Sequence, residues 1–437
     1  MAEMEARDRP PRGNGPVALN DATATRRQRL LDLQGPVPVP AITRIRIKNF
    51  KSIGAADVAL KPLTLLVGQN GAGKSNFLDA FRFTSDSLRS TVEYALRDRG
   101  GINEVRRRSR GHPTNFGIRL DLSLGGGWAG WYAFEISAKK NQGFEILREE
   151  CVVSYDDQPA AYFTVQRGTI TDSHLDDFFP DQVESDRLFL GLASGLPEFR
   201  RVYELLVGIG SYSLNLDAIR ELQNPDPADL LQRDGGNLAS VIRRVNEEAP
   251  SLAARVAEYL RAVVPGVRSV GPKTIGPKET IEFRQEVAGD PNPWRYLAAN
   301  VSDGTLRALG VLVAVFQTAP RGIGIPVVTI EEPEIAVHPG AAVRLMDALL
   351  EASRARQVIL TTHSPDLLDH PDLDIESVLV VESIEGNSLI GRVEDSLRQA
   401  VRDHLYTVGE LLRLEQLRGD LFDREASLQL RLFRAQE

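Results

Sequence analysis

The residues best suited to chemistry form one short stretch near the start of the chain, Gly68-Gln69-Asn70-Gly71-Ala72-Gly73-Lys74-Ser75. Its spacing is G-x-x-x-x-G-K-[ST]. In such a loop the glycines let backbone N–H groups face phosphates, the lysine reaches the β- and γ-phosphates, and the serine hydroxyl binds Mg²⁺. The sequence therefore predicts a site for a nucleoside triphosphate with Mg²⁺. The predicted nucleotide contacts are Gly68, Asn70, Gly71, Gly73, Lys74, Ser75 and Asn76.

The flanking segments have the pattern that this motif requires. Residues 63–67 are apolar and partly β-branched, as in a buried strand, and residues 76–81 carry apolar side chains at helical spacing. A helix that begins at the loop adds its dipole to the phosphate site. The alternative is a glycine-rich turn that binds nothing, and the strand–loop–helix context disfavours it.

Two carboxylates and a histidine at strand ends supply the second part of the predicted site. Glu331 and Glu332 close an apolar strand, and His363 follows another, residues 358–361. Glu331 can bind Mg²⁺ together with Ser75, while Glu332 can hold and deprotonate the attacking water. Each signal alone is weak, because such residues are often surface or core groups. Their order after a P-loop makes Lys74, Glu332 and His363 the predicted catalytic residues.

Composition bounds the class of protein. The chain has 437 residues and is 42% hydrophobic, which is enough for two or three domains. No apolar run approaches the roughly 18–20 residues of a membrane span, and no signal peptide opens the chain. Cys151 is the single cysteine, which excludes a disulfide framework and a cysteine-based zinc site. These features predict a cytoplasmic protein that does not enter a membrane.

A net charge of −8 argues against attraction of the whole surface to nucleic acid, but a local basic patch remains compatible with it. Arginines that follow the P-loop helix are the candidates. Two interpretations stay open, a solvated face and a phosphate-contacting patch. The residues are Arg97, Arg99, Arg106, Arg107, Arg108 and Arg110.

The chain divides into four predicted parts. A tail without apolar periodicity, residues 1–40, is expected to be disordered. Residues 41–170 form an ATPase lobe with the P-loop and an antiparallel β subdomain. Residues 171–290 are a mainly helical insert. Residues 291–437 alternate strands with helices, which favours a mostly parallel sheet with ligand sites at its carboxyl ends.

Four motifs in this order resemble those of the ABC-type ATPases of the RecF, SMC and OLD group. They are Walker A at 68–75, the signature Asn300-Val301-Ser302-Asp303-Gly304-Thr305, Walker B with the D-loop at 330–339, and the switch histidine in Thr361-Thr362-His363-Ser364-Pro365. The opening segment 45–52 is similar too. The resemblance covers roughly residues 41–115 and 290–415.

The resemblance implies an α/β P-loop NTPase with an ABC-ATPase-type head. It also implies a homodimer or higher oligomer that shares ATP, in which Ser302 and Gly304 of one subunit cap the nucleotide held by the P-loop of the other. ATP-driven head-to-tail dimerisation would then control action on DNA, in repair or antiviral defence, with a separate nuclease as partner.

Several departures from the family pattern stand out. The signature reads Ser-Asp-Gly-Thr rather than Ser-Gly-Gly-Gln, and Glu331 stands where many relatives have Asp. A Q-loop glutamine is not identified, and neither coiled-coil arms nor a Toprim nuclease domain is recognised. Two other functions stay open, a nucleotide-gated scaffold with very slow turnover and the nucleotide-binding subunit of a transporter. The pattern Glu-Glu-Pro-Glu and the large insert before the signature count against the transporter.

Overall fold

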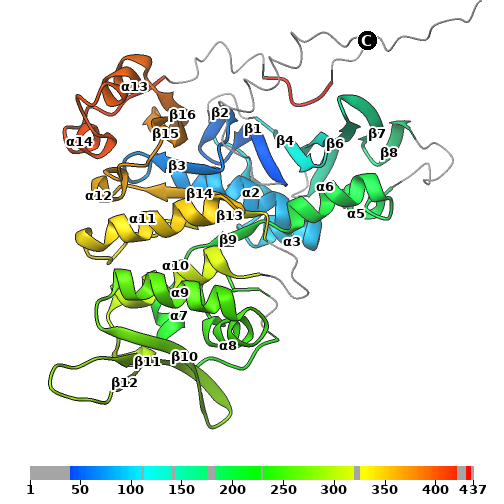
Figure 1. The fold of residues 1–437 in the computed structure, drawn as a ribbon. Helices are drawn as coiled ribbons and strands as arrows, with labels where there is room; N and C mark the ends of the chain where they lie inside the picture. The colour runs from blue at the N-terminus through cyan, green and yellow to red at the C-terminus, as the bar shows by residue number, and fades with distance from the viewer. Residues whose placement is uncertain are drawn as a thin grey trace, which may run out of the picture. The chain divides into compact units, whose positions relative to one another are not determined.

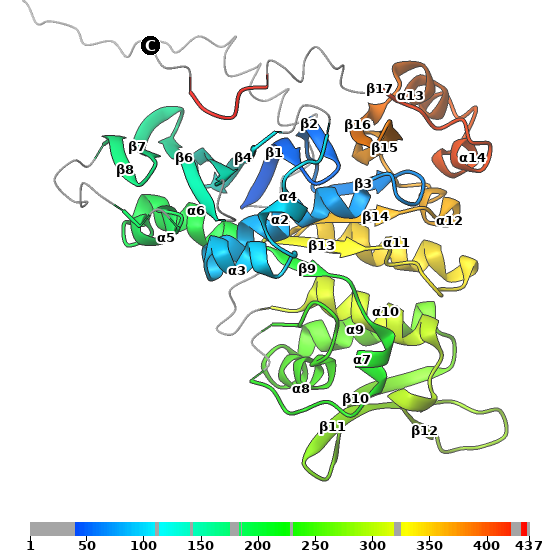
Figure 2. The same cartoon turned by 180° about the vertical axis from the view of Figure 1, so that it is seen from behind.

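The computed structural model describes residues 40–109, 113–139, 143–174, 183–184, 186–227, 230–318, 325–420 and 430–434. The predicted tail therefore lies outside the described residues except for Pro40, as does Arg110 of the arginine group. Residues 38–437 form one compact unit, which Figures 1 and 2 show from opposite sides.

A seven-stranded mixed sheet carries the predicted site. Its order is β17-β16-β15-β3-β14-β13-β9, with β15, β3, β14, β13 and β9 parallel, while β16 and β17 extend one edge by antiparallel pairing. The strands are β3 (Leu63–Val67), β9 (Gly210–Tyr212), β13 (Val327–Glu331), β14 (Gln357–Thr362), β15 (Val378–Ile384), β16 (Asn387–Val393) and β17 (Gly419–Asp420). Strands β3, β14 and β13 are parallel neighbours. The P-loop, His363 and the two glutamates, which lie where these strands end, are therefore found together at the carboxyl end of the parallel strands.

Both faces of this sheet are covered, since the side chains of its central strands β3, β13 and β14 are buried at nearly every position. Leu65 and Leu360 belong to one hydrophobic cluster, whereas Leu66 and Ile359, one residue away, belong to the other. The helix that follows the P-loop, α2 (Lys74–Arg89), contributes to the second cluster.

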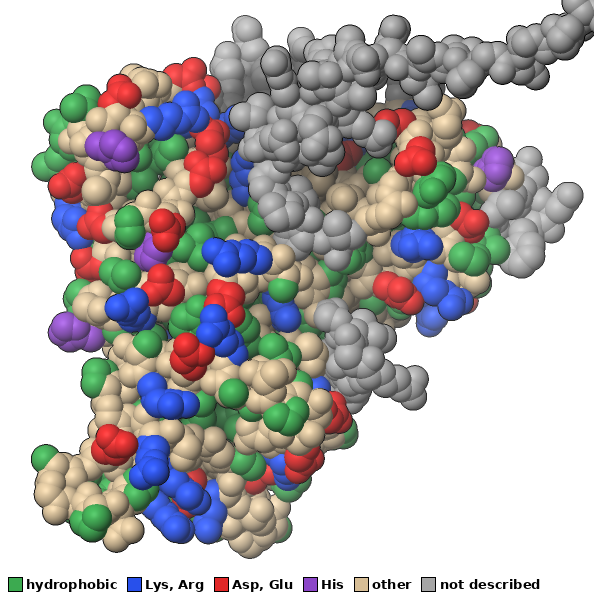
Figure 3. Space-filling view, viewed as in Figure 1, with side chains coloured by type: hydrophobic (Ala, Val, Ile, Leu, Met, Phe, Trp, Pro, Cys, Tyr) green, Lys and Arg blue, Asp and Glu red, His purple; other side chains and the backbone are tan. Residues whose placement is uncertain are grey.

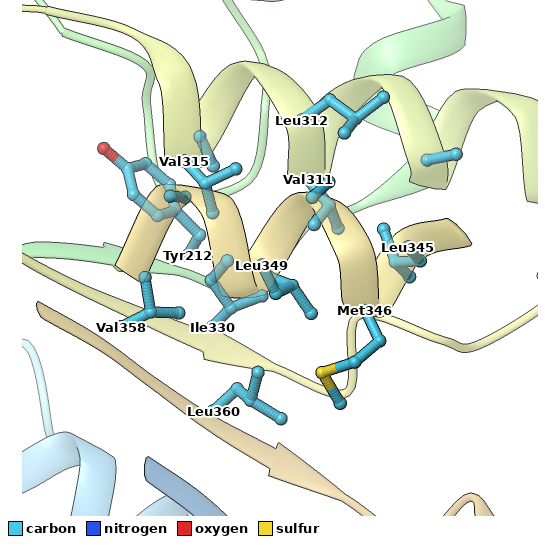
Figure 4. Close-up of a cluster of buried hydrophobic side chains, with 14 of the residues drawn as sticks. Tyr212, Val311, Leu312, Val315, Ile330, Leu345, Met346, Leu349, Val358 and Leu360 are labelled. Carbon is cyan, nitrogen blue, oxygen red and sulfur yellow. The ribbon is translucent and has the colours of Figure 1, made fainter. Parts of the chain in front are cut away.

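Two helices cover the first face, α10 (Asp303–Phe316) and α11 (Pro339–Ser353). Figure 4 shows side chains of both helices gathered above Ile330 and Leu360 of the sheet. Every residue of α10 from Thr305 to Phe316 is buried, so the helix that begins at the signature is a core element.

A second seven-stranded sheet is antiparallel, in the order β2-β1-β4-β5-β6-β7-β8. Its strands are β1 (Ala41–Phe50), β2 (Ile53–Ala59), β4 (Asn115–Gly125), β5 (Trp128–Ala138), β6 (Phe144–Tyr155), β7 (Gln158–Gln166) and β8 (Thr169–Ser173). Phe83 of α2 packs edge-on against Phe50 and Phe116 of this sheet, with ring centroids 5.8 and 5.4 Å away. The P-loop helix is therefore held by both large sheets.

The segment predicted as a mainly helical insert contains strands as well as helices. Its helices are α5 (Leu190–Ala193), α6 (Pro197–Val207), α7 (Leu216–Arg220), α8 (Leu238–Glu248) and α9 (Pro250–Val263). A three-stranded antiparallel sheet follows, made of β10 (Val267–Ile275), β11 (Lys278–Gln285) and β12 (Trp294–Leu297), before η1 (Ala298–Asn300). Strand β9 lies in the same sequence region but pairs with β13, so the insert contributes directly to the central seven-stranded sheet.

The remaining elements are short: α3 (Val92–Arg97), α4 (Ile102–Val105), α12 (Pro365–Leu368), η3 (Ile375–Ser377), α13 (Asp395–Arg402) and α14 (Val408–Arg413). Within the described ranges, no helix has the length and apolar character needed to cross a membrane. The prediction of an α/β fold with a mostly parallel sheet and an antiparallel subdomain is confirmed.

Candidate functional site

The P-loop leaves β3 at Val67 and ends where α2 begins at Lys74. Gly71 and Gly73 have φ values of 79° and 105°, a region that residues with a Cβ rarely adopt. Gly73 is the N-cap of α2, and no side chain caps this helix. The first N–H groups of a 16-residue helix are thus left for an anion, which is how helix N-termini bind phosphate.

Lys74 holds a positive charge directly over this loop. Its side chain is buried, and Nζ donates hydrogen bonds to the carbonyl oxygens of Gly68 (2.7 Å) and Gln69 (3.1 Å). Burial lowers the pKa of Lys74, while the nearby Glu332 and Glu334 oppose that change. Negatively charged phosphate would compensate a buried ammonium group better than two neutral carbonyls do.

The two predicted carboxylates stand at the end of β13 in different settings. Glu331 closes the strand, and its Oε1 lies 3.3 Å from Nη2 of Arg233 in the insert. Glu332 turns away with φ of 44°, and its N–H donates to the backbone oxygen of Thr361 (3.1 Å). Its Oε1 lies 3.5 Å from Nδ1 of His363, so the predicted base and the predicted switch histidine are brought together.

Glu334 is a site residue to which the sequence analysis assigns no role. Its Oε1 accepts hydrogen bonds from Thr362 Oγ1 (2.7 Å) and the His363 N–H (3.2 Å). Its Oε2 is buried and has no hydrogen-bond partner among the described residues. Glu334 belongs to the Walker B segment of the sequence. Only the fold shows that it holds the turn that carries His363.

Two arginines also surround the carboxylates, and the sequence predicts neither. Arg233 comes from the loop before α8, where its backbone oxygen accepts from the Ser213 N–H beyond β9. Arg307 is buried on α10, and its Nη1 donates to the Leu214 oxygen (3.0 Å). Burial lowers the pKa of Arg307, whereas nearby carboxylates, Glu332 first among them, oppose that change. Both arginines are positioned by the insert, so no local sequence motif near Walker B predicts them.

The signature begins α10, as its position predicts. Ser302 is the N-cap, and its Oγ lies 2.9 Å from Thr305 Oγ1 and accepts from the Thr305 N–H. A Cβ on Gly304 would overlap the backbone oxygen of Ala336, so the glycine permits close contact with the D-loop.

The P-loop opens on a cavity of about 620 Å³. Its lining includes Gly68, Asn70, Gly71 and His363, together with residues from the carboxyl end of β15. Ser302 and Gly304 are not among the described residues that line this cavity. The cavity thus brings the P-loop backbone and His363 together, whereas Lys74, Ser75, Glu331 and Glu332, like the signature residues, are not among its described lining residues.

Ser75 and Asn76 lie in different settings although both are predicted nucleotide contacts. Ser75 is exposed in the first turn of α2. The Asn76 amide donates to Ser52 Oγ (2.7 Å) and is thereby engaged in a contact behind the loop. For Mg²⁺, the hydroxyl of Ser75 and the carboxylate of Glu331 are oxygen donors of the type this ion prefers. With water and phosphate oxygens, these two residues would hold it.

The arginine group has mostly structural contacts. Arg99 is buried and forms ion pairs with Asp79 (2.9 Å) and Asp86 (3.0 Å) on α2. Arg106 donates to the Pro113 oxygen (2.9 Å), and Arg107 donates to Asn387 Oδ1 (2.7 Å). Arg108, which pairs with Glu104, has an exposed side chain. Arg99 and Arg107 therefore connect the segment after α3 to α2 and to β16, whereas Arg97, whose guanidinium lies over the Tyr94 ring, and Arg108 are exposed.

Two family descriptions match parts of the chain. Residues 41–145 match "AAA ATPase domain", and residues 217–369 match "AAA domain, putative AbiEii toxin, Type IV TA system". These ranges contain the P-loop and Walker B respectively, so both halves of the site lie in matched sequence.

Two kinds of curated relatives are similar to the chain. The OLD nuclease of Thermus scotoductus is 24% identical over 364 residues, which cover 75% of this chain and 60% of that protein. The DNA replication and repair protein RecF of Porphyromonas gingivalis is 53% identical over 45 residues, 10% of this chain and 12% of RecF. The chain thus spans only part of the length of either relative.

Two solved SMC heads share the fold. A SmcHead bound to the C-winged helix domain of ScpA aligns with a TM-score of 0.50 at 14% identity, covering 83% of this chain and 99% of that one. An Smc head domain with an extended coiled coil, bound to the C-terminal domain of ScpA derived from Pyrococcus furiosus, gives 0.50 at 14%, with 84% and 100% covered.

Proposed function

Because the chain is a RecF/SMC/OLD-like ABC-type ATPase, we propose that it binds ATP with Mg²⁺, hydrolyses it, and closes a nucleotide-bridged head-to-tail dimer that acts on DNA. One observation carries the ATPase part. The buried Lys74 begins helix α2, whose N-terminus no side chain caps, and it lies at the same carboxyl end of the parallel strands as Glu332 and His363. Oε1 of Glu332 and Nδ1 of His363 are 3.5 Å apart.

The residues divide the hydrolytic step between them. Lys74 and the N–H groups of α2 take up negative charge on the phosphates as the bond between the γ-phosphorus and its bridging oxygen breaks. Glu332 accepts a proton from the water whose oxygen attacks the γ-phosphorus, so ADP and inorganic phosphate leave. Glu334 fixes the turn that carries His363. Ser75 and Glu331 would hold Mg²⁺, which would supply positive charge to offset that of the phosphates.

The position of the signature supports the dimer. Ser302 and Gly304 do not line the described P-loop cavity of their own chain, and Ser302 begins the 14-residue helix α10. A second copy in head-to-tail arrangement would bring this helix to the nucleotide. The OLD and RecF relatives support a role on DNA, and the toxin-system description supports defence over repair.

A basic face on the three-stranded sheet supports contact with nucleic acid. Figure 3 shows blue side chains gathered over β10–β12, at the lower end of the view. Arg284 and Arg295 stand directly opposite each other on β11 and β12, and both are exposed. Like charges in that register destabilise a sheet. Glu282, whose Oε1 lies 3.3 Å from Arg284 Nε, offsets part of this repulsion, and a nearby phosphate backbone would offset more. The exposed cations of this sheet are Arg268, Lys273, Lys278, Arg284 and Arg295.

Two variants test the ATPase proposal. Lys74→Ala removes the charge over the loop, so we expect ATP binding to be lost. Glu332→Gln keeps the shape of the side chain but removes the base, so binding should survive while turnover falls by about 10²-fold or more. The measurements are ATP binding by calorimetry and phosphate release. As a control, Glu247→Gln changes an exposed glutamate of α8 and should match wild type.

The outcomes separate the candidate functions. Normal turnover in Glu332→Gln would refute the assignment of the base. Tight ATP binding by the wild type without measurable turnover would instead support the nucleotide-gated scaffold.

A further inference from the structure

A chain of three hydrogen bonds runs behind the P-loop and includes two serines that belong to no nucleotide motif. The Asn76 amide donates to Ser52 Oγ (2.7 Å), Ser52 Oγ lies 2.7 Å from Ser388 Oγ, and Ser388 Oγ donates to the Ala72 carbonyl (2.6 Å). Each hydroxyl has one proton to donate. Since Ser388 gives its proton to Ala72, Ser52 must donate to Ser388 and accept from Asn76. The donor direction is therefore fixed along the whole chain.

Distant parts of the sequence build this contact. Ser52 lies in the turn between β1 and β2 of the antiparallel sheet, and Ser388 lies in β16 at the edge of the central sheet. Ser388 is fully buried, and its N–H donates to the Ser52 oxygen (3.0 Å). Next to it, Asn387 Oδ1 accepts from the Gly54 N–H (3.0 Å) and from Arg107. Both sheets are thus anchored at the back of the loop.

Ser388 also occupies the place where a side chain at position 73 would lie. A Cβ built on Gly73 would overlap Ser388 Oγ and also lie too close to Ser52 Oγ (2.8 Å). The loop and the hydroxyl pair are therefore fitted to each other, and Gly73 is required by this contact as well as by its φ of 105°.

The hydrogen bond to Ala72 sets the orientation of one peptide unit of the loop. In a trans peptide the C=O and the following N–H point in opposite directions. Holding the Ala72 carbonyl toward Ser388 thus turns the Gly73 N–H toward the other side of the loop, away from the hydroxyl pair. Backbone N–H groups aimed in this way are what a P-loop uses to bind phosphate.

We propose that Ser388, supported by Ser52, is a positioning residue of the ATP site that presets the 72–73 peptide for phosphate. This inference rests on the proposed function. It makes the β15–β16 hairpin, beyond the last nucleotide motif, part of the machinery that binds ATP. A displacement of that hairpin would move Ser388 and, through its hydrogen bond, the Ala72 carbonyl of the P-loop.

The positioning role predicts a split between KM and kcat. A preset N–H binds phosphate in the ground state and in the transition state alike, so its loss raises KM and leaves kcat nearly unchanged. Ser388→Ala should raise KM and Kd for ATP by about tenfold, the equivalent of one hydrogen bond to a charged group. Ser52→Ala leaves the Ala72 contact in place and should raise KM only a few-fold.

The experiment compares Ser388→Ala, Ser52→Ala and the double variant with Ser353→Ala. Ser353 is a matched control, because its buried hydroxyl donates to the Leu350 carbonyl (2.7 Å) at the end of α11. We expect the control to keep the KM of wild type. In the double variant, the change in KM should be smaller than the product of the single changes, since both act through one hydrogen-bond chain.

The readouts are ATP affinity, KM, kcat and the melting temperature without nucleotide. An unchanged KM in Ser388→Ala and in Ser52→Ala, with active wild type, would overturn the positioning role while leaving the ATPase intact. If Ser388→Ala does not fold, Ser52→Ala decides, because Ser52 is only half-buried in a turn. Absence of ATP binding by the wild type would instead remove the proposed function itself.

Discussion

A buried carboxylate far from the P-loop in sequence should make the stability of the fold depend on pH. Glu149 of β6 is buried, and it accepts hydrogen bonds from Tyr132 Oη (2.8 Å) and from the N–H groups of Phe189 (2.5 Å) and Leu190 (2.9 Å). Burial raises the pKa of Glu149 from 4.5 to about 7, and these three hydrogen bonds oppose part of that change. In the unfolded chain the same carboxyl group would titrate near its ordinary value.

The sign and size of the effect follow from the two pKa values. Between pH 4.5 and about 7 the folded protein binds a proton at Glu149 that the unfolded chain has released. The free energy of unfolding must therefore fall as the pH rises through this window. The difference between the two pKa values corresponds to about 3 kcal/mol, fully present at low pH and lost once the pH passes about 7.

Urea unfolding at several pH values from about 5 to 8 measures this dependence. Glu149→Gln keeps the size of the side chain but does not ionise, so we expect the stability of wild type relative to the variant to fall by most of that amount. The comparison uses the change with pH, because the amide alters hydrogen bonding and shifts absolute stability at every pH. Glu247→Gln, at an exposed position, should run parallel to wild type. A constant difference between wild type and Glu149→Gln would refute the reasoning.

Two further predictions test assembly and DNA contact. Mixing Lys74→Ala with Ser302→Arg, each inactive alone, should restore ATPase activity up to roughly half of wild type per mixed dimer, since one of its two sites then carries neither defect. Normal hydrolysis by Ser302→Arg alone would rule out the shared site. Changing Lys273, Arg284 and Arg295 together to Ala should lower the log–log salt slope of DNA binding by about one unit for each phosphate that the variant no longer binds. Arg167→Ala, at an exposed position in the β7–β8 turn of the antiparallel sheet, serves as control, and an unchanged slope in the triple variant would remove this face from the proposal.

Much of the fold could be predicted because its signals are local. The P-loop strand and helix, the strand before the two glutamates and the helix after the signature all show their periodicity within short segments. Strand β10 is not predicted because Gly271 and Pro272 interrupt its alternation, and pairing with β11 stabilises a segment whose own strand propensity is low. The pairing of a strand with its neighbours cannot be predicted from the residues of that strand alone.

The supporting residues of the site could not be predicted, for a different reason. Ser52 and Ser388 lie 336 positions apart, and a serine in a strand carries no signal of what it touches. The arginine group is the opposite case, because its sequence does give a signal. A run of arginines is compatible with a basic patch, and only the fold shows which of their side chains are already paired. Arg99 pairs with Asp79 and Asp86, and burial of such pairs is set by packing rather than by local sequence.

Strained backbone occurs at both ends of the segment that connects Glu332 of the proposed ATP site with Ala336 of the D-loop. Glu332 and Ala336 have φ values of 44° and 64°, each of which costs about 1 kcal/mol or more for a residue with a Cβ. The turn at Glu332 is held by Thr361 of β14, next to the P-loop strand. The turn at Ala336 is held where Gly304 closely approaches its carbonyl. In the proposed head-to-tail dimer, this short segment would connect Glu332 of one ATP site with the signature helix that faces the nucleotide of the other subunit.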